Sequence, residues 1–195
     1  MAPARPASAG LHVIVLAAGM SSRFGSPKLL ADIQGRPMLA HAVDTAVDLA
    51  GAGDVMVVLG ADATRLAPLI LPAAVSVVVN QDFAEGIASS IRTGIAHAPP
   101  GARAVMIMLA DQFAVTVQEL RQLVTRWKRR PDCIVAAQYG TTTGAPAIFP
   151  SDLFPELAAL RGDRGAQSVL RRHRERVVGV PIPSAALDVD TPADL

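Results

Sequence analysis

The sequence has little cysteine and few aromatic residues. Cys133 is the only cysteine among 195 residues, which excludes an internal disulfide and any metal site built from several cysteines, and is typical of a reducing compartment. Aromatic residues make up 4% of the chain, although 51% of it is hydrophobic. The core must therefore be built mainly from Val, Ile, Leu, Ala and Met, a set typical of a buried parallel sheet covered by helices.

An excess of charge and a long hydrophobic run are absent as well. Eighteen Lys and Arg stand against seventeen Asp and Glu, a formal net charge of +1, so the composition does not indicate a nucleic-acid groove. No apolar stretch approaches the roughly 20 residues that a membrane-spanning helix needs. We therefore expect a cytoplasmic protein that binds neither nucleic acid nor membranes.

Short apolar runs alternate with segments of helical period along most of the chain. Residues 1–10 are rich in Ala, Pro, Ser and Gly and are predicted to be a disordered N-terminal extension, while residues 11–195 fit a single domain. Apolar runs bounded by Gly, Pro, Asp or Asn predict buried strands at 12–17, 54–59, 75–79, 104–109, 134–137 and 147–149. Helices are predicted at about 37–50, 61–71, 86–97 and 116–129, the last with a capping box at Thr116 and Glu119.

This alternation predicts an α/β fold with a mostly parallel sheet. Ligands of such sheets bind outside the carboxyl ends of the strands, so the residues just after each apolar run are the candidates for chemistry.

The loop after the first predicted strand has the composition of an anion-binding loop. Glycines such as Gly19 and Gly25 and three serines allow backbone amides to approach an anion, and Arg23 and Lys28 add two positive charges. The loop fits neither the Walker A pattern nor G-x-G-x-x-G. A flexible surface turn with solvated charges is the alternative.

The loop resembles the signature of the MobA-like nucleotidyltransferases, and its nearest branch is the molybdenum cofactor cytidylyltransferases. The resemblance rests on residues 16–19, Ser21, Arg23, Gly25, Lys28, Leu29, Leu30, Gly35, Pro37 and Met38. It implies a Rossmann-like three-layer sandwich. It also implies that Arg23 and Lys28 neutralise a bound triphosphate, while the loop wraps it through Leu16, Ala17, Ala18, Gly19, Ser21 and Ser22.

Carboxylates for a metal ion follow two other segments. Asp111 comes directly after the run 104–109, and a hard oxygen ligand there suits Mg²⁺, although Asp111 could instead cap the turn before Thr116. Near the end of the chain, Asp188 and Asp190 alternate along an extended stretch. The resemblance implies that one of them binds the same metal; we favour Asp190 slightly, and the sequence does not separate the two.

The resemblance also assigns the nucleotide site and the acceptor site. Asn80, Gly86, Ser89 and Ser90 would hold the nucleotide, with helix capping as their alternative. The sequence Ala-Ala-Gly at 17–19, in place of Ala-Gly-Gly, favours CTP over GTP. The residues expected to shape the acceptor pocket are Gln112, Gly144, Pro146 with Phe149, and Asp163, for which a loop cap is equally open.

Two positions depart from the family pattern. Phe113 stands where the family usually has proline, and Ala145 stands where it commonly has histidine. The missing histidine removes a hydrogen-bonding side chain from the acceptor pocket, which leaves acceptors other than molybdopterin open.

The resemblance implies a nucleotidyltransferase that uses Mg²⁺ to transfer CMP from CTP to a phosphorylated acceptor, molybdopterin first among them, with release of pyrophosphate. A molybdoenzyme or its chaperone is a candidate protein partner. One alternative is a sugar-phosphate or methylerythritol-phosphate nucleotidyltransferase. The other, from a different class, is a nucleotide-binding partner protein without catalysis.

Overall fold

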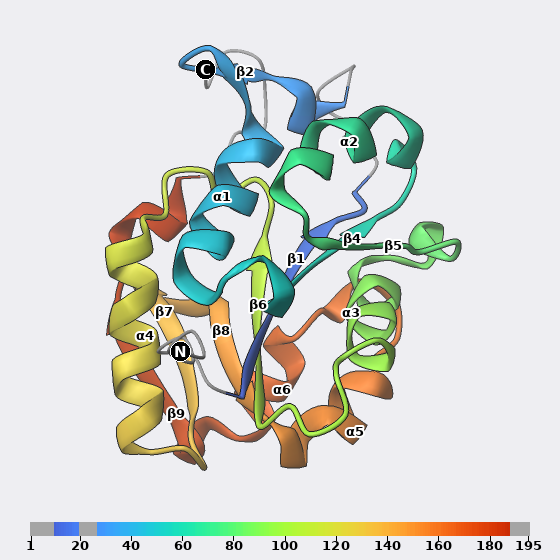
Figure 1. Ribbon diagram of the computed structural model, residues 1–195. Coiled ribbons are helices and arrows are strands. Elements are labelled where there is room, and N and C mark those ends of the chain that lie inside the picture. The colour runs from blue at the N-terminus through green and yellow to red at the C-terminus, as the bar shows by residue number, and fades with distance from the viewer. Residues whose placement is uncertain (1–9, 20–26, 188–195) are drawn as a thin grey trace, which may run out of the picture.

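A computed structural model describes residues 10–19 and 27–187. Its centre is a seven-stranded sheet in the order β5-β4-β1-β6-β8-β7-β9 (Figure 1). The strands are β1 (Leu11–Ala17), β4 (Val55–Leu59), β5 (Ser76–Val79), β6 (Ala104–Leu109), β7 (Ile134–Tyr139), β8 (Thr142–Pro150) and β9 (Val177–Pro181). Only β8 runs antiparallel to its neighbours β6 and β7; the other pairs of adjacent strands are parallel. The predicted mostly parallel sheet is confirmed.

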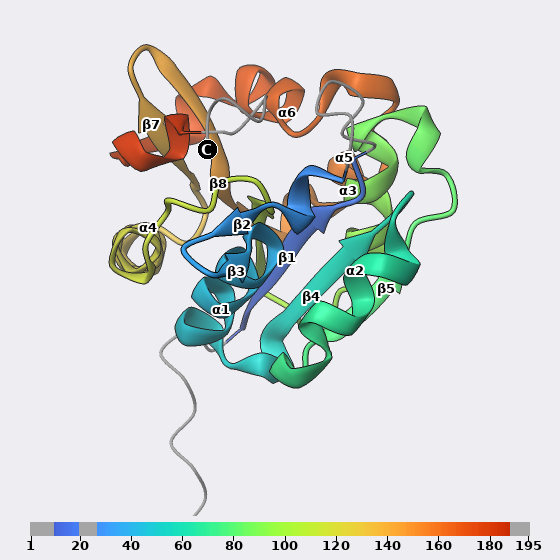
Figure 2. The same ribbon diagram turned by 90° about the horizontal axis from the view of Figure 1, so that it is seen from above.

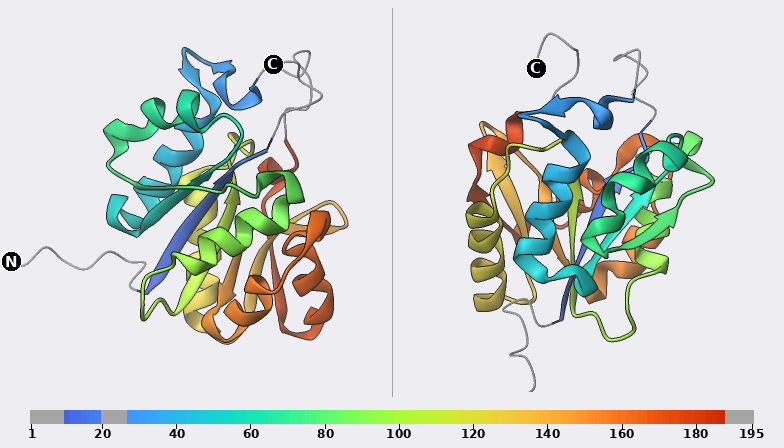
Figure 3. Two further views of the ribbon diagram at one scale, coloured as in Figure 1. Left: turned by 90° about the vertical axis from the view of Figure 1, so that its right-hand side faces the viewer. Right: turned by 45° about the horizontal axis from the view of Figure 1, so that its top comes forward.

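Helices cover both faces of this sheet, which gives the three layers visible in Figures 2 and 3. On one face lie α1 (Met38–Ala50), α2 (Ala63–Ile70) and α4 (Val117–Arg129). On the other lie α3 (Ile87–Ala96), α5 (Phe154–Ala158) and α6 (Gln167–Arg172). The expected three-layer sandwich is therefore correct.

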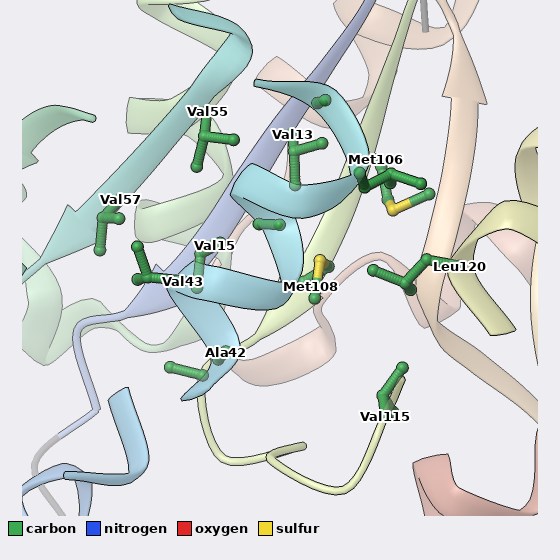
Figure 4. Packing of buried hydrophobic residues seen from close by; sticks show 14 of the residues in the cluster. Val13, Val15, Ala42, Val43, Val55, Val57, Met106, Met108, Val115 and Leu120 are labelled. Atoms are coloured by element: carbon green, nitrogen blue, oxygen red, sulfur yellow. The ribbon is translucent and has the colours of Figure 1, made fainter. Parts of the chain in front are cut away.

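The two cores follow from the alternation of side chains along the strands. In β1, Val13 and Val15 enter the cluster under α1, where Val15 lies close to Val43 (Figure 4), while Ile14 and Leu16 enter the cluster under α3. Because β1 is central and buried on both faces, its sequence reads as a continuous apolar run.

Each strand and helix predicted from the sequence is present, with ends shifted by a few residues. The structure adds β9, α5 and α6, as well as a small hairpin of β2 (Asp32–Ile33) and β3 (Arg36–Pro37). Cys133 is buried. Within the described ranges, none of the helices combines the length and the apolar character that crossing a bilayer would require.

The predictions made for residues 1–9, for Ser21, Ser22, Arg23 and Gly25, and for Asp188 and Asp190 lie outside the described residues.

Candidate functional site

The carboxyl ends of four parallel strands meet at one edge of the sheet. The Leu16 carbonyl at the end of β1 accepts a hydrogen bond of 3.0 Å from the Ala110 amide after β6. The Leu59 carbonyl at the end of β4 accepts one of 2.8 Å from the Asn80 amide after β5. The segments that follow β1, β6 and β5 are thereby brought to the same side of the molecule, where ligands of such sheets bind.

Lys28 and Asp111 form an ion pair at this edge. Lys28 opens the short 3-10 helix η1 (Lys28–Leu30), and its Nζ lies 2.8 Å from Oδ2 of Asp111. The two side chains are 13% and 27% exposed, so the pair is partly shielded yet open to a ligand. Thr116, not Asp111, caps the next helix. The structure thus joins two residues that the sequence placed in one site.

The chain is closely packed where β1 ends and the first loop begins. Leu16, Ala17 and Ala18 are buried, whereas Gly19 is exposed, and nothing lies within 4 Å of the position that a Cβ on it would occupy. Gly60, directly after β4, packs against Ala18 so closely that a Cβ there would lie 2.6 Å from the Ala18 carbonyl oxygen. Sequence reasoning missed Gly60, although a glycine at the end of an apolar run is a signal for close backbone approach.

Asn80, Ser89 and Ser90 form one buried hydrogen-bonded cluster. Nδ2 of Asn80 donates to the Ser89 hydroxyl at 2.7 Å and contacts the Ser90 hydroxyl at 3.1 Å. Its Oδ1 accepts from the Asp82 amide at 2.9 Å. The three side chains are at most 4% exposed. They fix the path of the chain into α3, and direct contact between these side chains and a nucleotide stays a prediction.

Gly86 joins the predicted nucleotide segment to the predicted acceptor residue Asp163. It precedes α3 with φ +102°, a conformation that favours glycine. A Cβ at this position would collide with Oδ1 of Asp163 and would lie 2.9 Å from the Gly162 carbonyl oxygen. Gly162 and Asp163 belong to the 3-10 helix η6 (Gly162–Arg164), which therefore lies directly against the start of α3.

Gln112 links three segments around Asp111. Its Nε2 donates to the carbonyl of Ala145 in β8 at 2.9 Å and to that of Ala185 in η8 (Pro183–Ala186) at 3.0 Å. The side chain is 4% exposed. Gln112 thus holds the segment after β6 against the predicted acceptor side, and its role in acceptor binding stays a prediction.

Gly144 and Pro146 lie between the start and the middle of β8, whereas Phe149 lies near its last residue. A Cβ at Gly144 would lie 2.6 Å from the Tyr139 hydroxyl, so glycine makes room for that ring. Phe149 is fully buried and pairs with Val105, near the start of β6. Because β8 is antiparallel to β6, this places Phe149 at the opposite end of the strand from Asp111. The expectation that Phe149 shapes the acceptor pocket is wrong.

Glu119 connects the start of α4 to η8 through a hydrogen bond. Its Oε1 accepts a hydrogen bond of 2.7 Å from the Ser184 hydroxyl, and its Oε2 accepts one of 2.8 Å from the Thr116 amide. Burial alone would raise the pKa of Glu119, but the bonds from Thr116 and Ser184 hold that pKa below its ordinary value.

Of the carboxylates predicted to bind metal, Asp111 is the one that lies within the described residues. Those residues contain no cluster of three or more His, Cys, Asp and Glu that could hold an ion by itself. Asp111 offers one hard carboxylate oxygen next to the ammonium group of Lys28, a donor that would fit a divalent cation shared with phosphate oxygens.

The fold agrees with a family comparison. Residues 13–177 match the model of the MobA-like NTP transferase domain. The chain belongs to this family. Membership confirms the resemblance to the MobA-like nucleotidyltransferases, a family that transfers a nucleotidyl group from a nucleoside triphosphate to an acceptor.

Two relatives align with nearly the whole length of this chain. Nicotine blue oxidoreductase from Paenarthrobacter nicotinovorans is 30% identical, with 91% of each chain covered. A "probable molybdenum cofactor guanylyltransferase" from Rhodopirellula baltica is 29% identical, with 93% of this chain and 88% of the relative covered. The names of these relatives describe different activities.

Solved structures of the same fold include the protein Rv0371c from Mycobacterium tuberculosis H37Rv. It is 31% identical, with 94% of both chains covered and a TM-score of 0.79. A structure of that protein in complex with manganese has a TM-score of 0.77 at 29% identity, with 94% of this chain and 95% of the other covered.

Proposed function

We propose that this protein transfers CMP from CTP to a phosphorylated acceptor of the molybdopterin class and releases pyrophosphate. An oxygen of the acceptor phosphate attacks the α-phosphorus, and the bond from that phosphorus to the bridging oxygen of the β-phosphate breaks. Such in-line chemistry asks the protein mainly to position the reactants and to neutralise developing charge.

The observation that carries the proposal is the Lys28–Asp111 pair, with 2.8 Å between Nζ and Oδ2. When a triphosphate binds, the ammonium group of Lys28 would move from Asp111 to a phosphate oxygen. The freed carboxylate, with Asp190 or Asp188, would hold Mg²⁺, which supplies positive charge to the phosphates. Arg23 would add a second cation, as the sequence predicts. The structure of Rv0371c in complex with manganese is consistent with the use of a divalent ion.

The remaining predicted residues would divide between the two substrates. We assign the loop from Leu16 to Ser22 to the triphosphate. The segment from Asn80 to Ser90 would hold the ribose and base, and Gln112, Gly144, Pro146 and Asp163 would shape the acceptor side. The contact between Gly86 and Asp163 supports this division, because it puts the two sets side by side.

The choice of CTP rests on Ala-Ala-Gly at 17–19, and a relative named as a guanylyltransferase makes GTP the competing donor. Ala145, in place of histidine, keeps sugar phosphates and methylerythritol phosphate among the acceptors. Since the catalytic pair is the same for each of these substrates, donor and acceptor must be tested together.

The test is pyrophosphate release from CTP, GTP, UTP and ATP with Mg²⁺, each combined with molybdopterin and with a panel of phosphorylated acceptors. Release that requires CTP and molybdopterin supports the proposal. Release with another donor or acceptor keeps the proposed mechanism and changes the assigned substrate. Nucleotide binding without release in any combination favours a partner protein without catalysis.

Variants test the catalytic pair separately from the choice of substrates. Lys28→Ala and Asp111→Ala should each lower turnover by at least about a hundredfold, a loss of roughly 2.7 kcal/mol of transition-state stabilisation. Lys128→Ala and Asp132→Ala, two exposed positions, serve as matched controls. Near-normal turnover in either site variant would contradict the role of that residue.

A second candidate activity is reduction of a small organic substrate. It is favoured by the full-length relative named nicotine blue oxidoreductase, while the absence of G-x-G-x-x-G from the first loop speaks against a Rossmann-type dinucleotide site. Oxidation of NADH or NADPH with nicotine blue as the acceptor, measured on the same preparation, would support it.

A further inference from the structure

An open groove lies beside the sheet edge that β9 forms. Its volume is about 390 Å³, and it is lined on one side by α4 and on the other by Val180 and Pro181 of β9. Figure 1 shows α4 next to this edge of the sheet. Arg121, Arg126 and Arg129 provide all the charges of the groove, and its other residues from α4 are polar and uncharged.

The three arginines have no acidic partner within the described part of the chain. Arg36, Arg92 and Arg176, by contrast, each contact a carboxylate, and the ion pairs of the described residues include none at Arg121, Arg126 or Arg129. Three uncompensated positive charges thus gather in one groove of a protein whose net charge is +1. The ligand that complements this groove is acidic.

The groove also borders an unpaired strand edge. Among the described strands, β9 pairs with β7 on one side and with none on the other. The outer edge of such a strand is a template for an extended peptide, which can add to the sheet through backbone hydrogen bonds. A ligand with a peptide backbone can therefore use both the edge and the charges.

The spacing of the arginines matches the side-chain spacing of a strand. At a rise of about 1.5 Å per residue, Arg126 and Arg129 lie roughly 7.5 and 12 Å along the helix axis from Arg121. Side chains on one face of a strand recur about every 6.7 Å. Carboxylates at positions i, i+2 and i+4 of an extended segment would lie at 0, about 6.7 and about 13 Å, within reach of three flexible arginine side chains.

We propose that this groove is a docking site for an extended acidic segment of a partner protein. The segment adds to β9 as an eighth strand and presents carboxylates at alternate positions to Arg121, Arg126 and Arg129. Single-stranded nucleic acid fits less well, because the groove has no aromatic side chain for base stacking. The carboxyl end of β9 points to the same end of the sheet as that of β6, which Asp111 follows, since β6, β7 and β9 run in the same direction. A docked partner would therefore lie at the same end of the sheet as the candidate active site.

The test uses a fluorescein-labelled peptide of ten residues with glutamate and valine in alternation, and the intact protein. Fluorescence anisotropy at low salt should show saturable binding. Replacing the three arginines together, as Arg121→Gln, Arg126→Gln and Arg129→Gln, should weaken it at least about tenfold. Lys128→Gln removes one positive charge from the same helix but outside the groove, and it should change the affinity less than about twofold.

Two further measurements test the strand pairing and the class of ligand. Two methylated peptides are compared, one with N-methyl groups on the odd-numbered amides and one with them on the even-numbered amides. Only one of the two should lose binding, because only one set of amides faces β9. A peptide with lysine in place of glutamate should not bind. The triple variant should keep its nucleotidyl transfer to a small acceptor, which separates this proposal from the proposed function.

The proposal is wrong if Lys128→Gln weakens binding as much as the triple variant does, or if both methylated peptides bind like the parent. It is also wrong if a ten-nucleotide thymidine strand binds more tightly than the peptide and loses that binding in the triple variant. The arginines are exposed and without ion pairs, so a folded triple variant is expected, and circular dichroism verifies it.

Discussion

At the scale of single residues, close contacts between backbone segments shape the candidate site as much as its charges do. Gly60 shows this most directly, because any Cβ there would lie 2.6 Å from the Ala18 carbonyl oxygen and 2.8 Å from the Ala18 Cβ. A backbone atom cannot move aside as the tip of a side chain can. The chain would therefore have to shift at Ala18, where the first loop begins.

We predict that Gly60→Ala lowers kcat/KM for the nucleotide by about tenfold or more and destabilises the protein by about 1–3 kcal/mol, as overpacking does. The control is Gly53→Ala, where a Cβ has nothing within 4 Å and φ is not positive. Steady-state kinetics and urea unfolding of both variants check this. If Gly60→Ala retains full activity, the close contact is not needed for the loop.

Gln112 is a second residue that holds backbone segments together, through the hydrogen bonds of its side-chain amide. Replacing it by glutamate keeps the shape but removes the donor, so the carbonyls of Ala145 and Ala185 would face a carboxylate. We expect Gln112→Glu to destabilise the fold at pH 7 by about 1–3 kcal/mol or more, the usual cost of leaving buried groups without a partner. Gln122→Glu, an exposed change in α4, should stay within about 0.5 kcal/mol of the parent. Urea unfolding curves of the two variants decide the matter.

At the scale of elements, α4 is fixed at its start by the capping box of Thr116 and Glu119. We predict that Thr116→Ala costs about 1 kcal/mol of stability, since one amide of the first turn loses its acceptor. Thr125→Ala, in the middle of the same helix, should cost less, because alanine is the better helix former there. Thermal unfolding of both variants measures the difference, and equal losses would contradict a capping role.

Glu119 makes part of this stability dependent on pH. Its pKa is lowered in the folded protein, so the carboxylate stabilises the fold above its ordinary pKa of about 4.5, and this contribution is lost as the pH falls through the folded pKa. Glu119→Gln should therefore lose stability at pH 7 and should lose less than the parent between pH 5 and pH 3. Urea midpoints across that range provide the measurement, with exposed Glu175→Gln as the control that should follow the parent.

The elements that the sequence predicted and those that it missed differ in length and in the range of their contacts. The runs at 12–17 and 104–109 are buried on both faces, and α1 and α4 are thirteen residues each, so their patterns are clear. In contrast, α5 and α6 have five and six residues, and β9 contains a glycine and a proline. These elements form because the rest of the fold holds them, and no local pattern predicts them.

The candidate site shows the same division. The position of Asp111 followed from the rule that ligands bind after parallel strands, and the role of Lys28 followed from a family resemblance. The contact between Gly86 and Asp163 and the two bonds of Gln112 join segments far apart in the sequence. Because such contacts depend on the packing of whole elements, they could be found only in the structure.

At the scale of the whole molecule, β1 contributes side chains to both cores. A titrating group within this strand therefore affects global stability. His12 lies in β1, is 3% exposed, and has no hydrogen-bond partner for either ring nitrogen. Burial lowers its pKa, and the nearby charge of Asp54 offsets only part of this effect. The folded protein therefore holds His12 neutral under conditions in which the unfolded chain would protonate it.

The sign of the pH dependence follows from this lowered pKa. The contribution of neutral His12 is fully present above the ordinary value of about pH 6.5 and is lost as the pH falls through the folded pKa, because the unfolded state then binds an additional proton. His12→Leu removes that proton. We predict a smaller fall of the urea midpoint between pH 7.5 and pH 5.5 in His12→Leu than in the parent protein. His97→Leu, at an exposed position after α3, should keep the dependence of the parent. The same slope in all three proteins would mean that His12 does not couple protonation to unfolding.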